Sequence, residues 1–389
     1  MDYQPLLPFA QTDRQKQIIE ALIQYGSQRK AAKAIGVHKK TVEESLYRVR
    51  RHAARKGYSP EHDMVHTVPD GFKVKGTSSL YKDNGELSLQ WVKSDIDKER
   101  QAEMMREAIA ALSEEIPREK LSKAPRLNYN KDLLNCFVIT DFHMGALSWE
   151  PETGADWDLD IAEDTLINWF KSAIEMSPNA ETALFAQISD LLHWDGFDAV
   201  TPASKHLLDA DTRFPKLVRV AIRVIRRVIR MMLDKHKYLH IIMADANHDP
   251  VSQVWLREWI NVLYEDEPRV TVDTSPSPYN VYEFGKVALF THHGHKRKPG
   301  NVSEVFAGKF REIFGRTKYA YAHMGHMHHL EVKENSLMIV EQHRTLAAPD
   351  AYAARGGYLS GRDAKVITYH KNYGEVSRST VSFDMVKPA

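Results

Sequence analysis

The sequence predicts an α/β protein with a separate all-α domain at its N-terminus. Apolar residues recur at helical spacing within residues 1–57, and after residue 135 short apolar runs alternate with helical stretches. A segment with period-two alternation lies between these regions. The 389 residues are enough for two or three domains, and 43% apolar with 27% charged residues excludes wholesale disorder.

Charge and cysteine content narrow the class of protein further. The 53 basic and 52 acidic residues give a net charge of +1, so any affinity for polyanions requires local charge asymmetry. The single cysteine, Cys136, excludes an intramolecular disulfide and a cysteine zinc site and indicates a reducing compartment. The N-terminus has no signal-peptide pattern, and five arginines interrupt the most apolar stretch, 217–233. We therefore expect a cytoplasmic protein with no membrane partner.

Residues 1–57 predict a helix-turn-helix domain. A capping box at Thr12 opens a helix over 13–25, and two further helices are expected over 28–35 and 39–56, with Gly36 forming the tight turn between them. Ten basic and two acidic residues give the segment 28–56 a local charge of +8. This asymmetry favours DNA as the partner, and a packing module or a protein-binding bundle is the alternative.

The third helix is the expected DNA-binding element, because a recognition helix places its first residues in the major groove. The expected contacts are His38, Lys39, Lys40, Thr41, Glu44, Arg48, Arg51 and Arg55.

Two connecting segments follow. Residues 58–94 predict a small β element, because 72–75 and 87–92 alternate in hydrophobicity around the turn signal Asp83-Asn84-Gly85. Residues 95–130 predict a helical linker, since the charge-dense stretch 97–115 precedes two prolines.

Residues 131–389 predict an α/β domain. Buried strands are expected at 136–140, 183–188, 239–244, 287–291, 319–322 and 337–340, and helices at 162–174, 216–233 and 302–314. Most of the strands end in polar residues of one chemical type. These clusters are Asp141-Phe142-His143, Ser189-Asp190, Asn247-His248-Asp249, His292-His293-Gly294-His295 and His323 to His329.

The ends of strands in an open α/β sheet build a site at one edge. Mixed oxygen and imidazole ligands without thiolate suit first-row divalent ions, with Mn²⁺ the first choice and Fe²⁺ or Zn²⁺ the alternatives. The number of candidate ligands exceeds the needs of one ion. Two ions about 3.5–4 Å apart activate water and stabilise an in-line displacement at phosphorus.

At these residues the chain resembles the calcineurin-like metallophosphoesterases, whose five sequence blocks occur here in order over about 135–386. The resemblance implies a layered β-sandwich flanked by helices. It also implies one metal bound by Asp141, His143, Asp190 and His328, and a second bound by Asp190, Asn247, His293 and His326. His292 is the alternative to His293, and His248 is the implied proton donor or phosphate ligand. Ser189 and Ala246 stand where the family usually has glycine.

The order of domains resembles bacteriophage-encoded proteins that place a helix-turn-helix before a metallophosphoesterase domain. This implies a bacterial host cell as the location and a metal-dependent phosphodiesterase acting on DNA as the function. Two alternatives stay open: a small-molecule phosphatase or cyclic-nucleotide phosphodiesterase, and a DNA-binding regulator with an idle phosphoesterase domain. His193 and His323 are expected beside the site as orienting residues. The sequence leaves the oligomeric state open.

Overall fold

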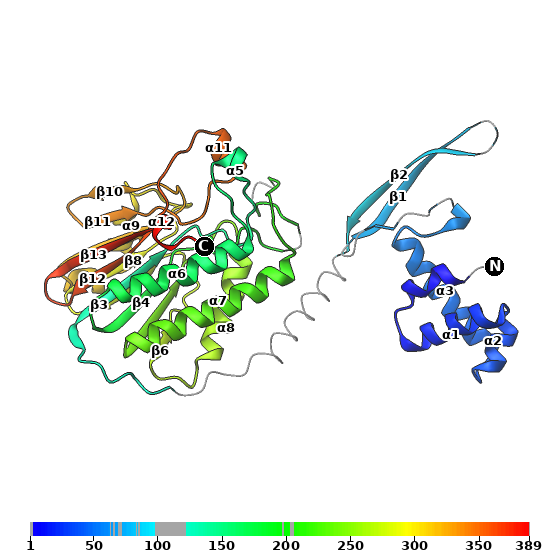
Figure 1. The fold of residues 1–389 in the computed structure, drawn as a ribbon, viewed down its shortest axis with the longest axis horizontal. Coiled ribbons are helices and arrows are strands. Elements are labelled where there is room, and N and C mark those ends of the chain that lie inside the picture. The colour runs from blue at the N-terminus through cyan, green and yellow to red at the C-terminus, as the bar shows by residue number, and fades with distance from the viewer. Residues whose placement is uncertain are drawn as a thin grey trace. The chain divides into compact units, whose positions relative to one another are not determined.

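The computed structural model describes residues 3–62, 64, 67–68, 72–82, 84, 86–97, 122–196, 198–202 and 206–388. The chain divides into two compact units, Met1–Ala111 and Leu112–Ala389 (Figure 1). Most of the expected linker, including the helical stretch from residue 98 onward, lies outside the described residues, as do Asp83 and Gly85 of the expected turn. No helix among the described residues has the length and apolar character needed to cross a membrane.

The three predicted N-terminal helices are confirmed. The first unit contains η1 (Gln4–Phe9), α1 (Asp13–Tyr25), α2 (Gln28–Ala34), α3 (Lys39–Arg55) and η2 (Pro60–His62). The Thr12 side chain accepts the N–H of Gln15, which caps α1 as the sequence predicts. Ile18 and Leu22 of α1 pack in one core with Val42 and Leu46 of α3. The apolar face of each helix therefore holds the bundle together.

The predicted hairpin is also confirmed, and its strands are longer than the sequence indicates. β1 (Phe72–Tyr81) pairs antiparallel with β2 (Leu87–Ile96), with Leu80 opposite Leu89.

Two sheets packed face to face form the second unit. Their strand orders are β13-β12-β3-β4-β5-β6 and β10-β11-β9-β8-β7. The strands are β3 (Asn130–Ile139), β4 (Ala180–Gln187), β5 (Tyr238–Met243), β6 (Val270–Val272), β7 (Asn280–Phe284), β8 (Val287–Thr291), β9 (Tyr319–Met324), β10 (Glu331–Glu334), β11 (Ile339–Gln342), β12 (Asp363–His370) and β13 (Gly374–Ser382).

Helices cover the outer faces of the two sheets. The helices of the second unit are α5 (Glu150–Thr153), α6 (Leu159–Met176), α7 (Phe214–Lys235), α8 (Pro250–Leu263), α9 (Val302–Lys309), α10 (Arg311–Arg316), α11 (Ala351–Arg355) and α12 (Phe383–Val386), of which α5 and α11 contact each other. Phe137 of β3 packs on Phe170 of α6, and α6 lies beside α7 (Figure 1). On the other sheet, Phe290 of β8 packs on Phe306 of α9. The layer order is therefore helix, sheet, sheet, helix, and the predicted layered α/β sandwich is confirmed.

Several elements differ from the sequence prediction. The single helix expected over 302–314 is two helices that meet at Phe310. The strands β6, β7, β10, β12 and β13 and the helix α8 were not predicted.

A buried charged cluster joins the two sheets. Glu341 of β11 is 2% exposed and contacts Lys365 of β12 at 2.5 Å and Arg378 of β13 at 3.0 Å. Burial raises the pKa of the Glu341 carboxyl, but His343 and Lys365 outweigh this effect and lower the pKa from 4.5 to about 2. The carboxylate is therefore ionised in the folded protein and neutralised by cations of the opposite sheet.

The substitution Glu341→Gln should lower the free energy of unfolding by about 3 kcal/mol near neutral pH, because Lys365 loses its buried partner. The folded-state pKa is depressed, so the contribution of Glu341 is present above the ordinary pKa and is lost as the pH falls from 4.5 towards 2. The difference between wild type and variant should narrow over that range. Urea denaturation at several pH values measures it, and a difference independent of pH would contradict the assignment.

Candidate metal centre

The polar clusters follow strands that end at one edge of the sandwich. β3, β4 and β5 run parallel in one sheet, and β8, β9 and β11 run parallel in the other. Backbone hydrogen bonds join the segments that follow these strands. The N–H of Asp141 donates to the Ser189 carbonyl at 2.9 Å, and the N–H of Gly325 donates to the His293 carbonyl at 2.8 Å.

The backbone at this edge is unusual. All the non-glycine residues with positive φ in the described chain lie here: Asp141 (49°), His143 (45°), Ser189 (66°), Asp190 (44°), His326 (77°) and His328 (54°). This conformation is costly for residues with a Cβ and persists only where surrounding contacts enforce it. Ser189 thus adopts a conformation that glycine takes easily, and its hydroxyl donates to the Ala244 carbonyl. Ala246 is not among the residues with positive φ.

Asp141, His143 and His328 form a first group of potential ligands whose atoms lie within 4.8 Å of one another. The Nε2 atom of His328 is 3.2 Å from Asp141 Oδ1 and 3.3 Å from His143 Nε2. Asp141 Oδ2 accepts the N–H of His326 at 2.7 Å and the hydroxyl of Thr140 at 2.5 Å. Asp141 Oδ1 is buried and has no hydrogen-bond partner among the described residues, as expected of an oxygen that binds a cation.

Asp190, His293 and His326 form a second group within the same distance limit. His293 Nε2 lies 3.1 Å from Asp190 Oδ2 and 2.8 Å from Asn247 Oδ1. Asp190 Oδ1 accepts the N–H groups of Asn247 and His248, both at 3.0 Å. Hydrogen bonding therefore fixes one oxygen of Asp190 and leaves the other facing His293.

The carboxylate of Asp141, a member of the first group, also approaches the second group. Its Oδ1 atom is 3.2 Å from His328 Nε2 of the first group and 3.8 Å from His293 Nε2 of the second. The family resemblance implied Asp190 as the shared ligand, and that role stays a prediction. The oxygen placed within 4 Å of a nitrogen in each group belongs to Asp141.

His292 and His293 point in different directions. His292 Nδ1 is 2.9 Å from the Pro278 carbonyl oxygen, and its ring stacks on Tyr279. His293 instead places Nδ1 at 2.9 Å from the Ile188 carbonyl oxygen and Nε2 among the carboxylates. The structure thus brings His293, and not His292, into the candidate centre.

Electrostatics at the centre suit divalent cations. Burial lowers the pKa of His143 well below 6.5 and that of His326 to about 4, so both imidazoles are neutral and able to bind metal. Burial also lowers the pKa of His293, but Asp190 and Asp141 outweigh it and raise that pKa to about 10. A proton on His293 therefore offsets part of the negative charge of Asp190 and Asp141 in the absence of an ion. Divalent ions would take over that neutralisation, and the residues present fit them.

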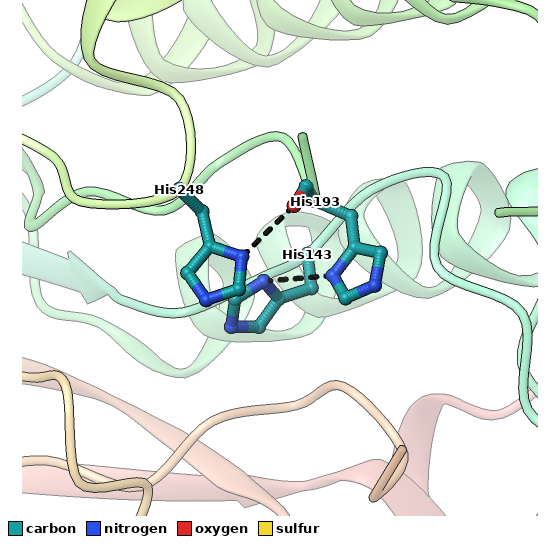
Figure 2. A group of neighbouring side chains, drawn as sticks. All are labelled: His143, His193 and His248. Carbon is teal, nitrogen blue, oxygen red and sulfur yellow. Dashed lines mark hydrogen bonds between the residues drawn. The ribbon is translucent and has the colours of Figure 1, made fainter. Parts of the chain in front are cut away.

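His248 and His193 lie beside the first group (Figure 2). The ring centroids of His248 and His143 are 4.7 Å apart, and His248 Nδ1 is 2.9 Å from the His193 carbonyl oxygen. Nδ1 therefore carries a proton, and His248 is one of the residues that line the cavity described next. His193 Nδ1 is 3.3 Å from His143 Nδ1, and its orienting role stays a prediction. His323 instead contacts His343 and Tyr369.

Two further sets among the described residues meet the same distance limit: His143, His193 and His248, and His323, Glu341 and His343. The set that contains Glu341 is less suited to metal. The carboxylate of Glu341 already binds the cationic side chains of Lys365 and Arg378. These cations would repel a further positive charge.

A cavity of about 630 Å³ opens beside the two principal groups. His143, Asp190, His248, His326 and His328 contribute to its lining, and the rest comes mainly from residues 345–362. A substrate in this cavity would contact the candidate ligands directly.

The expected DNA-contacting residues lie on the first unit. His38 precedes α3, and Lys39, Lys40, Thr41, Glu44, Arg48, Arg51 and Arg55 lie on it. All eight are exposed, and 44, 48, 51 and 55 follow the spacing of one helix face. Lys39 pairs with Glu43 at 2.9 Å.

No family model matches the sequence, and no curated protein matches it either. Among solved structures, the chain is similar to a predicted phosphoesterase from Streptococcus pneumoniae, with 10% identity, a TM-score of 0.25, and coverage of 64% of this chain and 98% of that one. An archaeal phosphodiesterase gives 13% identity, a TM-score of 0.32, and coverage of 64% and 99%. Vps29 complexed with zinc, from Entamoeba histolytica, gives 11% identity, a TM-score of 0.27 and the same two coverages. At these values the similarity alone identifies neither an activity nor a ligand.

The adjacent histidines give a matched test of the centre. His293→Ala should weaken Mn²⁺ binding by more than about tenfold, because it removes a ligand between two carboxylates. His292→Ala should leave the affinity close to wild type. Isothermal titration with Mn²⁺ measures both, with circular dichroism confirming that each variant is folded. An equal loss in the two variants would contradict the assignment.

Proposed function

We propose that the second unit is a metal-dependent phosphodiesterase. The observation that carries this proposal is the pair of Asp/His groups, with Asp141 of the first group within 4 Å of a nitrogen of the second, beside a cavity of about 630 Å³. Two divalent ions bound there would supply an activated water and charge stabilisation for in-line displacement at phosphorus. We expect Mn²⁺ first, with Fe²⁺ or Zn²⁺ as alternatives.

His248 is the residue placed to handle a proton. The His193 carbonyl accepts the Nδ1 hydrogen, so Nε2 is the atom left to contact a phosphate, and in the doubly protonated ring it is the atom that gives a proton to a leaving oxygen. Asp190 holds the backbone that carries this side chain, because its Oδ1 accepts the N–H groups of Asn247 and His248. The same carboxylate that is a candidate metal ligand therefore also positions His248, the proposed proton donor.

We propose DNA as the substrate, delivered by the helix-turn-helix of the first unit. The exposed basic residues of α3 support this proposal, because arginine side chains on one helix face bind successive phosphates. Two alternatives are separated from this proposal by the experiments below. In the first, the substrate is a small phosphoester and the N-terminal bundle serves only assembly. In the second, the protein is a regulator with an idle phosphoesterase domain.

Hydrolysis should depend on both the metal and His248. With Mn²⁺ the wild type should cleave oligonucleotides faster than cyclic nucleotides or p-nitrophenyl phosphate, and a chelator should abolish the activity. His248→Ala should lower kcat by about 10²–10⁴-fold while retaining Mn²⁺ binding. His370→Ala is the matched control, because His370 lies at the end of β12 that pairs with the start of β3. Full activity in His248→Ala would remove the proposed mechanism.

The arginines of α3 should set the salt dependence of DNA binding. Replacing Arg48, Arg51 and Arg55 together by alanine in the full chain should reduce the slope of log K against log salt by about 0.9 per lost phosphate contact. Replacing the exposed Arg14 and Lys16 of α1 is the control and should leave the slope unchanged. Fluorescence anisotropy with a labelled duplex measures both. An unchanged slope in the α3 variant would exclude DNA contact by this face.

A further inference from the structure

The cavity beside the two groups of candidate ligands has a second wall that the proposed hydrolysis does not use. Residues 345–362 form it, including the short helix α11. Tyr352 and Tyr358 both line the cavity, yet their side chains are 74% and 63% exposed. Their ring centroids are 6.2 Å apart, and the ring planes differ by 30°. Large aromatic faces exposed at a catalytic cavity are typical of ligand contact.

This wall is held to the edge of the sandwich by polar contacts. The Thr345 hydroxyl donates to the Asp141 carbonyl at 2.6 Å, and the Ser148 hydroxyl donates to the Pro349 carbonyl at 2.9 Å. Arg355 of α11 pairs with Glu152 of α5 at 2.7 Å. The Asp350 carboxylate accepts the N–H of Ala353 at 2.8 Å and caps α11. The tyrosines are therefore carried on a segment tied directly to a candidate metal ligand.

Arg362 adds a cation to the same wall. Its guanidinium lies 3.5 Å from the centroid of the Phe383 ring, and its Nε donates to the Leu346 carbonyl at 2.9 Å. Arg362 lines the cavity, and the part of its guanidinium that reaches the cavity can donate to a phosphate oxygen.

We infer that this wall binds single-stranded DNA on one side of the cleaved phosphate. Tyr352 and Tyr358 stack on bases, and Arg362 binds a neighbouring phosphate. The inference rests on the proposed phosphodiesterase function and names its substrate class. Stacking on a tyrosine face requires a base whose own face is free, so stacked bases within duplex DNA cannot make this contact. The helix-turn-helix would then bind the duplex part of a substrate, while the cavity accepts an unpaired strand.

The test compares two single-stranded oligonucleotides, one normal and one with abasic residues beside the cleavable phosphate. Tyr352→Ala and Tyr358→Ala should each raise KM for the normal strand about tenfold with little change in kcat, because stacking on each base is lost. Neither variant should change KM for the abasic strand. Tyr352→Phe and Tyr358→Phe should behave as wild type, because phenylalanine keeps the ring. Arg362→Gln should raise KM for both strands, since both retain the phosphates.

Tyr373→Ala is the matched control, because Tyr373 is also an exposed tyrosine but lies in the turn between β12 and β13. Unchanged KM in both tyrosine-to-alanine variants, with an active wild type, would overturn the inference and leave the proposed function standing. A wild type that cleaves no phosphodiester would overturn the proposed function instead. In that case the Kd of a labelled single-stranded trinucleotide, measured with chelator present, tests the wall separately, and equal Kd values for wild type and alanine variants would overturn the inference.

Discussion

The carboxylate of Asp141 is the contact on which the organisation of the site depends. Its Oδ2 atom is held by the Thr140 hydroxyl and by the N–H of His326, which follows a strand of the opposite sheet. A Cβ at Gly325 would collide with that carboxylate and with the Thr140 hydroxyl, so only glycine lets the two sheets meet this closely. With Oδ2 fixed, Oδ1 is left facing imidazole nitrogens of both ligand groups. One hydrogen-bonded carboxylate thus joins the ends of two sheets and places an oxygen close to both groups of candidate ligands.

The sandwich stabilises a site that is locally unfavourable. Left-handed backbone at six non-glycine residues and several buried charges all lie at one edge. Each left-handed residue costs roughly 1–2 kcal/mol, and buried carboxylates add a desolvation penalty. The apolar layers between the sheets and beneath the helices offset this cost. Binding of cations would remove part of this cost, because the carboxylates and imidazoles would then coordinate a cation in place of the proton on His293.

The sequence predicted those parts of the molecule whose signal is local. The helix over Asp13–Tyr25 follows from a capping residue, an apolar stripe and a closing glycine, and the structure has the same bounds. The strand-end clusters were visible because each ligand block directly follows a buried apolar run. The strand β13 was missed because most of its residues are at least partly exposed and it carries no apolar run. The orientation of His292 against His293 depends on Tyr279 and Pro278, which are distant in sequence. Residues 345–362 carry no motif, and only tertiary contacts bring their tyrosines to the cavity.

The central claim is that two cations share this edge of the sandwich, and anomalous diffraction from crystals grown with Mn²⁺ tests it most directly. The account predicts two peaks about 3.5–4 Å apart. One should be bound by Asp141, His143 and His328, and the other by Asp190, Asn247, His293 and His326. A single peak, or peaks that these side chains do not contact, would contradict the account.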